Sequence, residues 1–589
     1  MPTIYPMVMG REVMLSTEHY LSASAGARVF ARGGNAIDAA VAATLVEGVV
    51  NPHMHTIGGE APMLIYSANA RRVVAINGNM MAPARATIAH YRSLGLELMP
   101  HSGLLAAGVP AAFDSMVTAL SEFGTMSLAD VLEPALALAH EGFPMHVGLA
   151  GEIVDASNPQ HAGAGASLRT HARRFLDEWP STGRVYLPDG EVPPVGAIVK
   201  NPALAKFFRR LLDAEASAKN RGREAALRAA SDRFYRGDIA MEIVAWSDAN
   251  GGLLQASDLA AFKTRIETPV SADYRGATVH KCGPWSQGPV FLQQLKILEG
   301  FDLTAMGHNS TDYIHTVIES AKLAFADREA YYADPDFVEV PIRALVSKEY
   351  GDVRRSLIDA HRVSMEQRPG DPLTMRPLRE NGSIEARAWG SGTIHVTACD
   401  RTGNMIAITA SGGWIPSSPV MESLGFPLGS RMQTFFLDEH HPNALKPGKR
   451  PRTTLSPSLA TRDGEPYLAF GTPGGDQQDQ WTLQFFLNVV DFGMALQQAI
   501  EAPKFSSAHF PSTFYPHNTR PGVLRIEERV DEKTRAQLAS RGHLIELRPP
   551  WSEGHVLAVE LDRSRGLLRG GCDPRGQQVP SMPAATIGW

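Results

Sequence analysis

The segment Trp389-Gly-Ser-Gly-Thr-Ile-His-Val-Thr-Ala-Cys399 passes from a polar stretch into a β-like run within a few residues. Residues 361–392 are polar, are punctuated by Pro and Gly, and have no apolar periodicity, which indicates a long linker that ends directly before Thr393. A second apolar run, Met405-Ile-Ala-Ile-Thr-Ala-Ser411, follows the turn Asp400-Arg-Thr-Gly-Asn404. The pattern predicts a β-hairpin whose first strand begins at Thr393, directly after a mobile linker.

A threonine at such a junction can act as a nucleophile. A hydroxyl needs a base to take its proton. If the bond between Gly392 and Thr393 were cut, Thr393 would gain an α-amine with a pKa of about 7.7–8.0, which suits a general base at neutral pH. Gly392 has no side chain that would obstruct attack on its carbonyl. The alternative is that Thr393 only begins a strand, where threonine is common.

Two further segments carry groups that acyl transfer needs. The run Ala469-Phe-Gly-Thr-Pro-Gly-Gly475 follows an apolar strand. Its paired glycines, Gly474 and Gly475, can present adjacent backbone N–H groups to an oxyanion. Thr453 and Thr454 lie on a proline-bracketed loop, where their hydroxyls suit a polar substrate group. Taken singly, each segment is also compatible with ordinary turn chemistry.

The remaining chain predicts a mixture of helices and strands. An apolar run capped by Asn35 predicts a helix, and two short apolar runs predict a hairpin of buried strands. The predicted helices are 36–50, 128–140 and an exposed one over 214–233, and the hairpin strands are 63–66 and 73–76.

Composition excludes several classes of protein. The 589 residues carry 56 Lys and Arg against 62 Asp and Glu, a net charge of −6, which provides no basic field for nucleic acid. Three scattered cysteines do not make a disulfide framework. No secretory signal pattern and no apolar run long enough to span a bilayer is visible. We therefore expect a cytoplasmic protein without a nucleic-acid or membrane partner.

Known cofactor and nucleophile motifs are missing. The sequence has no Gly-x-Ser-x-Gly elbow, no phosphate-binding P-loop and no complete dinucleotide fingerprint. The pairs His53-Met-His55 and His440-His441 lack partners at metal-ligand spacing. We expect neither a metal nor an organic cofactor.

Together and in this order, these segments resemble the γ-glutamyltransferase family of N-terminal-nucleophile (Ntn) hydrolases. Further segments at family-like places extend the resemblance over nearly the whole chain: 33–40, 81–87, 108–110, 142–144, 491–494, 497–503 and 571–575. The resemblance implies an α/β (α+β) fold, the four-layer αββα sandwich. It also implies a proenzyme that cuts itself into a large chain, 1–392 with the linker 361–392, and a small chain, 393–589. The two would form one fold, and further dimerisation is left open.

The resemblance also assigns roles to residues. Thr393 falls at the nucleophile and Ser411 where the family has a second threonine that hydrogen-bonds it. Gly474 and Gly475 match the oxyanion glycines. The substrate-binding positions that retain a hydroxyl are Thr409, Thr453 and Thr454.

The groups that read glutamate in this family are replaced. Asn79 stands in place of the arginine that clamps the α-carboxylate, and Thr434 in place of the aspartate that pairs with the α-ammonium group. Arg431 replaces a glutamine, and Gly413 a binding asparagine. The run Ile57-Gly-Gly-Glu-Ala-Pro62 lacks two of the family's glycines. The chain is in this respect similar to a divergent branch that contains acylase-like hydrolases.

These observations favour an autoprocessing threonine amidohydrolase or acyltransferase that cleaves a small amide through an acyl-enzyme on Thr393 and is not a strict γ-glutamyl enzyme. Arg431 or Arg452 could contact an acidic acyl group. One alternative is a genuine γ-glutamyltransferase or glutathione hydrolase. Another is an unprocessed, non-catalytic binding protein with the same fold. The sequence leaves open the amide, the acceptor and the choice between hydrolysis and transfer.

Overall fold

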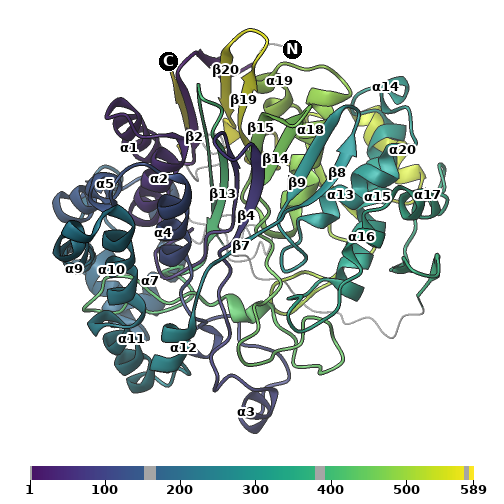
Figure 1. Ribbon diagram of the computed structural model, residues 1–589. Helices are drawn as coiled ribbons and strands as arrows, with labels where there is room; N and C mark the ends of the chain where they lie inside the picture. The colour runs from purple at the N-terminus through teal and green to yellow at the C-terminus, as the bar shows by residue number, and fades with distance from the viewer. Residues whose placement is uncertain (1–2, 152–167, 379–391, 576–582) are drawn as a thin grey trace.

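Two seven-stranded antiparallel sheets lie at the centre of the computed structural model, which describes residues 3–151, 168–378, 392–575 and 583–589 (Figure 1). Sheet I contains, in spatial order, β21 (Ala585–Gly588), β2 (Val13–Thr17), β12 (Thr393–Asp400), β13 (Met405–Ser411), β3 (Met63–Ser67), β4 (Arg72–Asn77) and β7 (Arg265–Glu267). Sheet II contains β1 (Val8–Gly10), β20 (Leu567–Cys572), β19 (Leu557–Asp562), β15 (Glu465–Gly471), β14 (Ser458–Arg462), β9 (Ala277–Lys281) and β8 (Val270–Tyr274).

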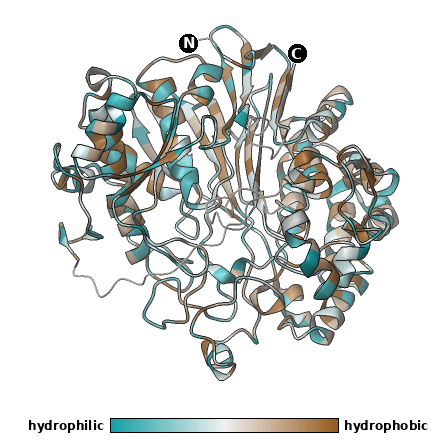
Figure 2. Ribbon diagram, turned by 180° about the vertical axis from the view of Figure 1, so that it is seen from behind, coloured by the Kyte–Doolittle hydropathy of each residue, from teal (hydrophilic) through white to brown (hydrophobic). Residues whose placement is uncertain are grey.

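Helices cover the outer face of each sheet (Figures 1 and 2). The helical layer on sheet I contains α1 (Tyr20–Ala31), α2 (Ala36–Val50), α4 (Ala112–Phe123), α5 (Leu128–Glu141), α9 (Pro202–Ala218), α10 (Arg223–Tyr235) and α11 (Asp238–Ala249). The layer on sheet II contains α13 (Pro289–Leu298), α15 (Thr311–Tyr331), α17 (Lys348–Arg355), α18 (Gln478–Val490), α19 (Leu496–Glu501) and α20 (Glu532–Ser540). This is the predicted four-layer αββα arrangement, which is confirmed.

Shorter elements complete the chain. The short helices are α3 (Ile88–Ser93), α6 (Val147–Ala150), α7 (Leu168–Asp177), α8 (Pro180–Tyr186), α12 (Ala256–Ala261), α14 (Leu303–Met306) and α16 (Ile342–Leu345). A three-stranded sheet of β16 (Phe505–Ser507), β17 (Val523–Glu527) and β18 (Leu544–Arg548) lies beside sheet II, and two-stranded pairs are formed by β5 (Phe143–Pro144) with β6 (Ile198–Val199) and by β10 (Gly370–Asp371) with β11 (Arg376–Pro377).

The hairpin β12–β13 occupies the middle of sheet I, because β12 pairs with β2 and β13 pairs with β3. Alternate side chains of β12 point to different cores: Ile394, Val396 and Ala398 pack towards the helices. On the opposite face, the Thr397 hydroxyl donates to the Ala469 carbonyl of β15 at 3.3 Å, across the gap between the sheets. Because side chains alternate between the two faces of a strand, Thr393 lies on the same inter-sheet face as Thr397. It is the first residue of β12.

Most of the predicted elements are present. Helix α2 spans Ala36–Val50, and Asn35 caps it by accepting hydrogen bonds from two backbone N–H groups. Helix α5 ends one residue later than expected, and the hairpin strands are β3 and β4. The single helix predicted over 214–233 is wrong: α9 ends at Ala218 and α10 begins at Arg223. Gly222 between them has φ +95°, which an α-helix does not accommodate.

Part of the predicted linker 361–392 is packed against the protein. Arg368 pairs with the buried Glu319 at 3.1 Å, and the Gly370 N–H donates to Asp327 at 2.8 Å. Residues 379–391 lie outside the described residues.

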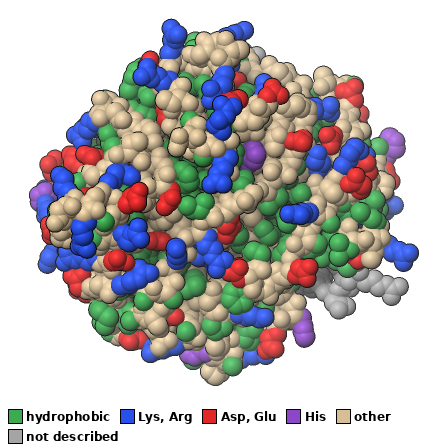
Figure 3. Space-filling view, in the orientation of Figure 1, with side chains coloured by type: hydrophobic (Ala, Val, Ile, Leu, Met, Phe, Trp, Pro, Cys, Tyr) green, Lys and Arg blue, Asp and Glu red, His purple; other side chains and the backbone are tan. Residues whose placement is uncertain are grey.

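Charges of both signs are interspersed over the face shown in Figure 3. Many charged side chains of the described residues form local pairs, such as Arg210 with Asp238 and Glu242. In the described ranges, no helix combines the length and the apolar character needed to cross a membrane.

Helix α2 is buried in the core, and the loop that follows it packs against Gly392, directly before β12. Every residue of the helix is buried, and Glu47 accepts a hydrogen bond at 2.6 Å from the side chain of Asn51, which caps the helix C-terminus. Burial raises the pKa of Glu47 to about 8. The carboxyl group is therefore protonated in the folded protein at pH values where it is ionised in the unfolded chain.

This pKa predicts a pH-dependent stability. Because the folded pKa is above the unfolded one, the contribution of Glu47 is complete below about pH 4.5 and is lost as the pH rises through 8, with a slope of up to about 1.4 kcal/mol per pH unit. Glu47→Gln should therefore gain thermal stability relative to the unmodified protein between pH 5 and pH 8, measured as Tm. Replacement of the exposed Glu122 by Gln is the control. Parallel pH profiles for Glu47→Gln and the unmodified protein would contradict the prediction.

Candidate active site

The open end of the hairpin brings the predicted nucleophile and its partner together. Thr393 and Ser411 are opposite residues of β12 and β13, and their hydroxyl oxygens are 3.3 Å apart. Both side chains are buried, with Thr393 only 1% exposed. The strand register, set over the whole length of the hairpin, thus fixes the two hydroxyls relative to each other.

The carbonyl oxygen of Gly392 is held by two donors. The Ser411 hydroxyl donates to this oxygen at 2.6 Å. The indole N–H of Trp414 donates to the same oxygen at 2.6 Å and also to the Met54 carbonyl at 2.8 Å. The peptide bond predicted to be cut is therefore fixed beside the Thr393 hydroxyl.

Close packing explains why residue 392 is a glycine. A β-carbon there would lie 2.6 Å from the His53 carbonyl oxygen and 2.7 Å from the Met54 Cα, well inside van der Waals contact. Any larger residue would have to move the Gly392 peptide away from the loop that follows α2.

Arg431 is buried next to Ser411. Its Nη2 donates to the Ser411 hydroxyl oxygen at 2.7 Å, and its Nε forms an ion pair with the Glu60 carboxylate. The guanidinium carbon lies 4.8 Å from the ring centre of Trp414 and 5.5 Å from that of Phe514. Burial raises the pKa of Glu60, and the positive charge of Arg431 opposes this shift. The arginine is thus placed by a carboxylate and two aromatic rings.

The backbone of Glu60 is tied to the same point. Its N–H donates to the Ser411 carbonyl at 2.8 Å, and the Ser411 N–H donates back at 3.0 Å. Gly59 makes this approach possible, because a β-carbon there would be 2.1 Å from the Ser411 carbonyl oxygen.

Thr409 lies two residues before Ser411 on β13, opposite His395 instead of Thr393. Its hydroxyl is 2.9 Å from Nδ1 of His395, its cross-strand partner. Burial lowers the pKa of His395 to about 3, so the imidazole is neutral at physiological pH. The ring fills the space beside Gly471, where a β-carbon would approach within 2.2 Å. Thr409 thus supports the layer beneath the nucleophile.

Gly474 caps the short 3-10 turn that leads into α18, and Gly475 is the first residue of that turn. Both have positive φ, +122° and +60°, and a β-carbon at these positions would meet Trp481 and Phe514 respectively. Phe514 is also one of the rings beside Arg431, so the two glycines belong to the same neighbourhood as the hairpin end.

The predicted threonine pair is close to these glycines. Gln287 connects the two segments, because its backbone N–H donates to the Thr453 carbonyl at 2.9 Å and its side chain donates to the Gly475 carbonyl at 3.2 Å. The buried hydroxyl of Thr454 has no hydrogen-bond partner in the described part of the chain.

The residues at the positions where the family recognises glutamate make contacts within the protein itself. The side chain of Asn79 donates to the Pro451 carbonyl at 2.5 Å, and the Thr434 hydroxyl donates to the Arg431 carbonyl at 3.0 Å. Gly413 has φ +64°, and a β-carbon there would be 2.1 Å from the Thr56 hydroxyl oxygen. An asparagine at that position would not fit this backbone.

Both arginines considered for an acidic acyl group already have a carboxylate partner. Arg452 pairs with Glu329 at 2.9 Å, and Arg431 pairs with Glu60. Arg450, on the same loop as Arg452, donates to the backbone carbonyls of Asn79 and Lys263. These positive charges are neutralised or bound within the protein.

Sequence reasoning missed two residues of the site. Glu60 was visible only as an interruption of the glycine run, and nothing indicated that it would pair with Arg431. Trp414 follows Ser411 by three residues, and only the folded turn shows its contact with Gly392.

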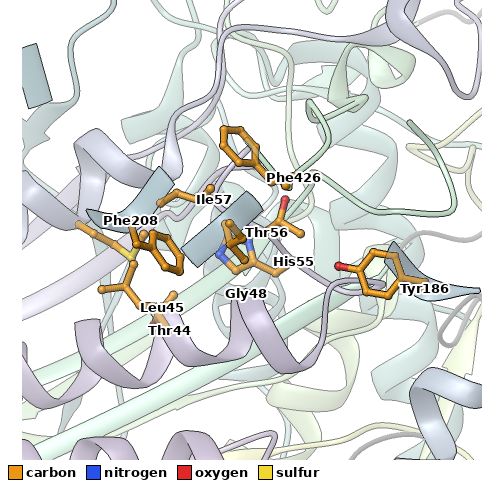
Figure 4. Close-up of a pocket in the computed structure, with 12 residues that line it drawn as sticks. Thr44, Leu45, Gly48, His55, Thr56, Ile57, Tyr186, Phe208 and Phe426 are labelled. Carbon is orange, nitrogen blue, oxygen red and sulfur yellow. The ribbon is translucent and has the colours of Figure 1, made fainter. Parts of the chain in front are cut away.

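A small cavity lies between α2 and the loop around Phe426 (Figure 4). It has a volume of about 10 Å³ and is lined mainly by apolar groups, so it holds at most one water molecule. His55, one of its walls, approaches the Ser411 carbonyl oxygen at 3.2 Å. The cavity is too small to be a substrate site.

The packing around residue 392 predicts the effect of a single methyl group. Gly392→Ala should slow cleavage of the bond before Thr393, because the added carbon must push the carbonyl away from Ser411 and Trp414. Gly48→Ala, in α2, is the matched control, since its nearest neighbours would be at an ordinary 3.5 Å. Cleavage followed over time on denaturing gels should be slower for Gly392→Ala only. Equal rates for both variants would contradict the prediction.

Known proteins of one family are similar to this chain over nearly its whole length. A family model described as gamma-glutamyltranspeptidase matches residues 22–582. The glutathione hydrolase-like YwrD proenzyme of Bacillus subtilis is 32% identical, over 97% of this chain and 98% of its own, and the acylase ACY 1 proenzyme of Pseudomonas sp. SE83 is 32% identical, over 96% and 92%. The solved structure of LmbA2991HD is 42% identical with a TM-score of 0.91, over 100% of both chains. The chain belongs to the gamma-glutamyltranspeptidase family and is an enzyme of the Ntn hydrolase and transpeptidase group.

Proposed function

We propose that this enzyme cuts its own chain between Gly392 and Thr393 and then uses Thr393 to cleave a small amide. One observation supports the proposal most directly: the Thr393 hydroxyl is buried at the start of β12, beside a peptide carbonyl that two donors fix at 2.6 Å. The related YwrD and ACY 1 proteins, both named proenzymes, support the cleavage step.

The mature enzyme would work by acyl transfer. The new α-amine of Thr393 takes the hydroxyl proton, and the oxygen adds to the amide carbonyl of the substrate. Backbone N–H groups of Gly474 and Gly475 would stabilise the oxyanion. The intermediate then collapses, the protonated amine leaves, and water or a second amine takes the acyl group from Thr393.

Cleavage need not separate the two parts of the chain. β12 and β13 lie between β2 and β3 in sheet I, and sheet II likewise mixes strands from before and after residue 392. The two chains would share the central sheets as well as both cores.

The acyl group of the substrate need not be γ-glutamyl. Asn79 and Thr434 bond within the protein, and the nearby arginines are paired, so none of them reads the α-carboxylate or the α-ammonium group in the way that the family pattern implies. An amide without an α-amino group on its acyl part fits this environment better. Genuine glutathione hydrolysis is the alternative, and the relative named glutathione hydrolase-like favours it.

Purified protein should separate into two chains on a denaturing gel. Shared in proportion to residue number, the 63.7 kDa mass gives about 42 kDa for residues 1–392 and about 21 kDa for residues 393–589. N-terminal sequencing of the small chain should begin Thr-Ile-His. Full-length protein with good amidase activity would contradict the mechanism.

Two variants serve as controls for this cleavage. Thr393→Ala should block cleavage and turnover, because one hydroxyl performs both acyl transfers. Thr393→Ser should retain part of each, since the hydroxyl and the future amine remain. Self-cleavage of the alanine variant would show that Thr393 is only a strand residue and not the nucleophile.

Specificity can be measured with three anilides that differ in one group each: γ-glutamyl, glutaryl and butanoyl. Loss of the carboxylate clamp and of the ammonium partner removes about 1.5–3 kcal/mol each, a combined factor of roughly a hundred to ten thousand in kcat/KM. We expect the glutaryl and butanoyl compounds to be used at least as well as the γ-glutamyl compound. A strong preference for γ-glutamyl anilide would support the glutathione hydrolase alternative.

A further inference from the structure

The carbonyl oxygen of Gly392 would carry the negative charge during self-cleavage. We infer that the Ser411 hydroxyl and the Trp414 indole N–H form the oxyanion hole of this maturation step, and that the Arg431–Glu60 pair positions Ser411. The inference rests on the proposed self-cleavage and adds to it the groups that stabilise its transition state. Both donors are 2.6 Å from the oxygen before any reaction occurs.

The hydrogen bonds of Ser411 fix the direction of its hydroxyl. A serine hydroxyl has one hydrogen and two acceptor sites. The Arg431 guanidinium can only donate, so it occupies one acceptor site at 2.7 Å. The Gly392 carbonyl can only accept, so it takes the hydrogen at 2.6 Å. The other acceptor site remains for the Thr393 hydroxyl at 3.3 Å, whose hydrogen then points to Ser411.

Arg431 therefore does more than fill space. Its positive charge makes the Ser411 hydroxyl a stronger donor, and stronger donation matters most when the carbonyl oxygen becomes negative. The Glu60 carboxylate holds Nε of the arginine, while the Glu60 backbone pairs with that of Ser411. Arginine, serine and the backbone of the hairpin end thus form one rigid unit.

Trp414 is also held in advance. Its side chain is 2% exposed, and its ring lies against the Arg431 guanidinium at 4.8 Å. The Ile415 N–H that follows donates to the Pro52 carbonyl at 3.1 Å, which anchors the turn. The indole N–H is shared between Gly392 and Met54, and it can shift towards Gly392 as that oxygen gains charge. Donors placed before the reaction are the most effective stabilisers of an oxyanion.

The reaction balances with water as its only co-reactant. The Thr393 oxygen adds to the Gly392 carbonyl carbon, and the electron pair of the C=O bond moves to the oxygen held by Ser411 and Trp414. The C–N bond then breaks, and the hydroxyl proton ends on the Thr393 nitrogen, which leaves an ester. Water hydrolyses the ester to the Gly392 carboxylic acid and restores the Thr393 hydroxyl.

This hole differs from the one expected in turnover. The Gly392 carbonyl belongs to the large chain and can leave the site once the bond is cut, whereas Gly474 and Gly475 are on the loop before α18. Removal of the Trp414 N–H should therefore lower the rate of self-cleavage more than the rate of substrate turnover.

Trp414→Phe is the first test. It keeps an aromatic ring beside Arg431 and removes the N–H. Protein made by cell-free synthesis, followed over time on denaturing gels, should cleave about 10²–10³-fold more slowly than the unmodified chain, the usual cost of one oxyanion donor. Trp179→Phe, at the start of α8, should cleave at the unmodified rate. Cleavage of Trp414→Phe at that rate would overturn the inference.

A second variant tests whether slow cleavage of Trp414→Phe results from misfolding instead of the lost N–H group. Benzothienylalanine at position 414 has nearly the shape of tryptophan, with sulfur in place of the N–H. It should slow cleavage as Phe does, with an unfolding temperature close to that of the unmodified precursor. Rapid cleavage by this variant would also overturn the inference.

The positioning role of Arg431 is tested by coupling. Ser411→Ala should slow cleavage, and Ser411→Thr should restore it. Arg431→Leu should slow cleavage when Ser411 is present and should have little further effect in Ser411→Ala, because the arginine acts through the serine. Equal effects of Arg431→Leu in both backgrounds would show that the arginine is merely structural.

The outcomes also separate this inference from the proposed function. Cleavage of Thr393→Ala would refute self-cleavage by Thr393. An uncleaved Thr393→Ala together with normal cleavage of Trp414→Phe would refute only the oxyanion hole.

Discussion

The antiparallel register of β12 and β13 is the constraint on which the site depends. It places Thr393 opposite Ser411 and His395 opposite Thr409. A slip of one residue would turn every side chain of the strand to the other face, so Thr393 would enter the helix-side core and Ile394 would replace it. The flanking strands β2 and β3 prevent such a slip, because each has its own register with the hairpin. Thr393, the proposed nucleophile, is thus positioned by the central strands of a seven-stranded sheet.

A buried ion pair completes the end of this hairpin. Arg431 and Glu60 are both fully buried, and such a pair contributes little net stability because desolvation offsets the attraction. Loss of one partner is much more costly, since the other charge is then left unpaired. The pair is better explained by its geometry: one of the arginine's N–H groups donates to the Ser411 hydroxyl, which donates to the Gly392 carbonyl of the bond proposed to be cut. Here a charge is used to orient a hydroxyl.

Local patterns in the sequence predicted much of the fold. The hairpin, α2 with its Asn35 cap, and the β3–β4 pair are short-range features that alternation and capping residues specify. The glycine that interrupts 214–233 was overlooked because helix-forming residues surround it. Partners distant in sequence were beyond such reasoning: Glu60 and Arg431 are brought together only by the folded chain. The same holds for Trp414. Its indole N–H donates to the Gly392 carbonyl only because the chain turns after Ser411, and no local sequence signal predicted this contact.

The ion pair between Arg431 and Glu60 affects which acyl groups the site can bind. A substrate carboxylate that displaced Glu60 from Arg431 would gain about 1.5–3 kcal/mol from a charged hydrogen bond. The displaced Glu60 carboxylate would then be buried without a partner, which costs about 3–5 kcal/mol. The exchange is unfavourable unless Glu60 takes up a proton, which the raised pKa of its buried carboxyl makes easier. Nη1 of Arg431, by contrast, has no hydrogen-bond partner among the described residues, and it can donate to a neutral carbonyl without disturbing the pair. The pairing of Arg431 with Glu60 therefore supports the proposal that this site distinguishes acyl groups more by their shape and hydrogen-bond acceptors than by their charge.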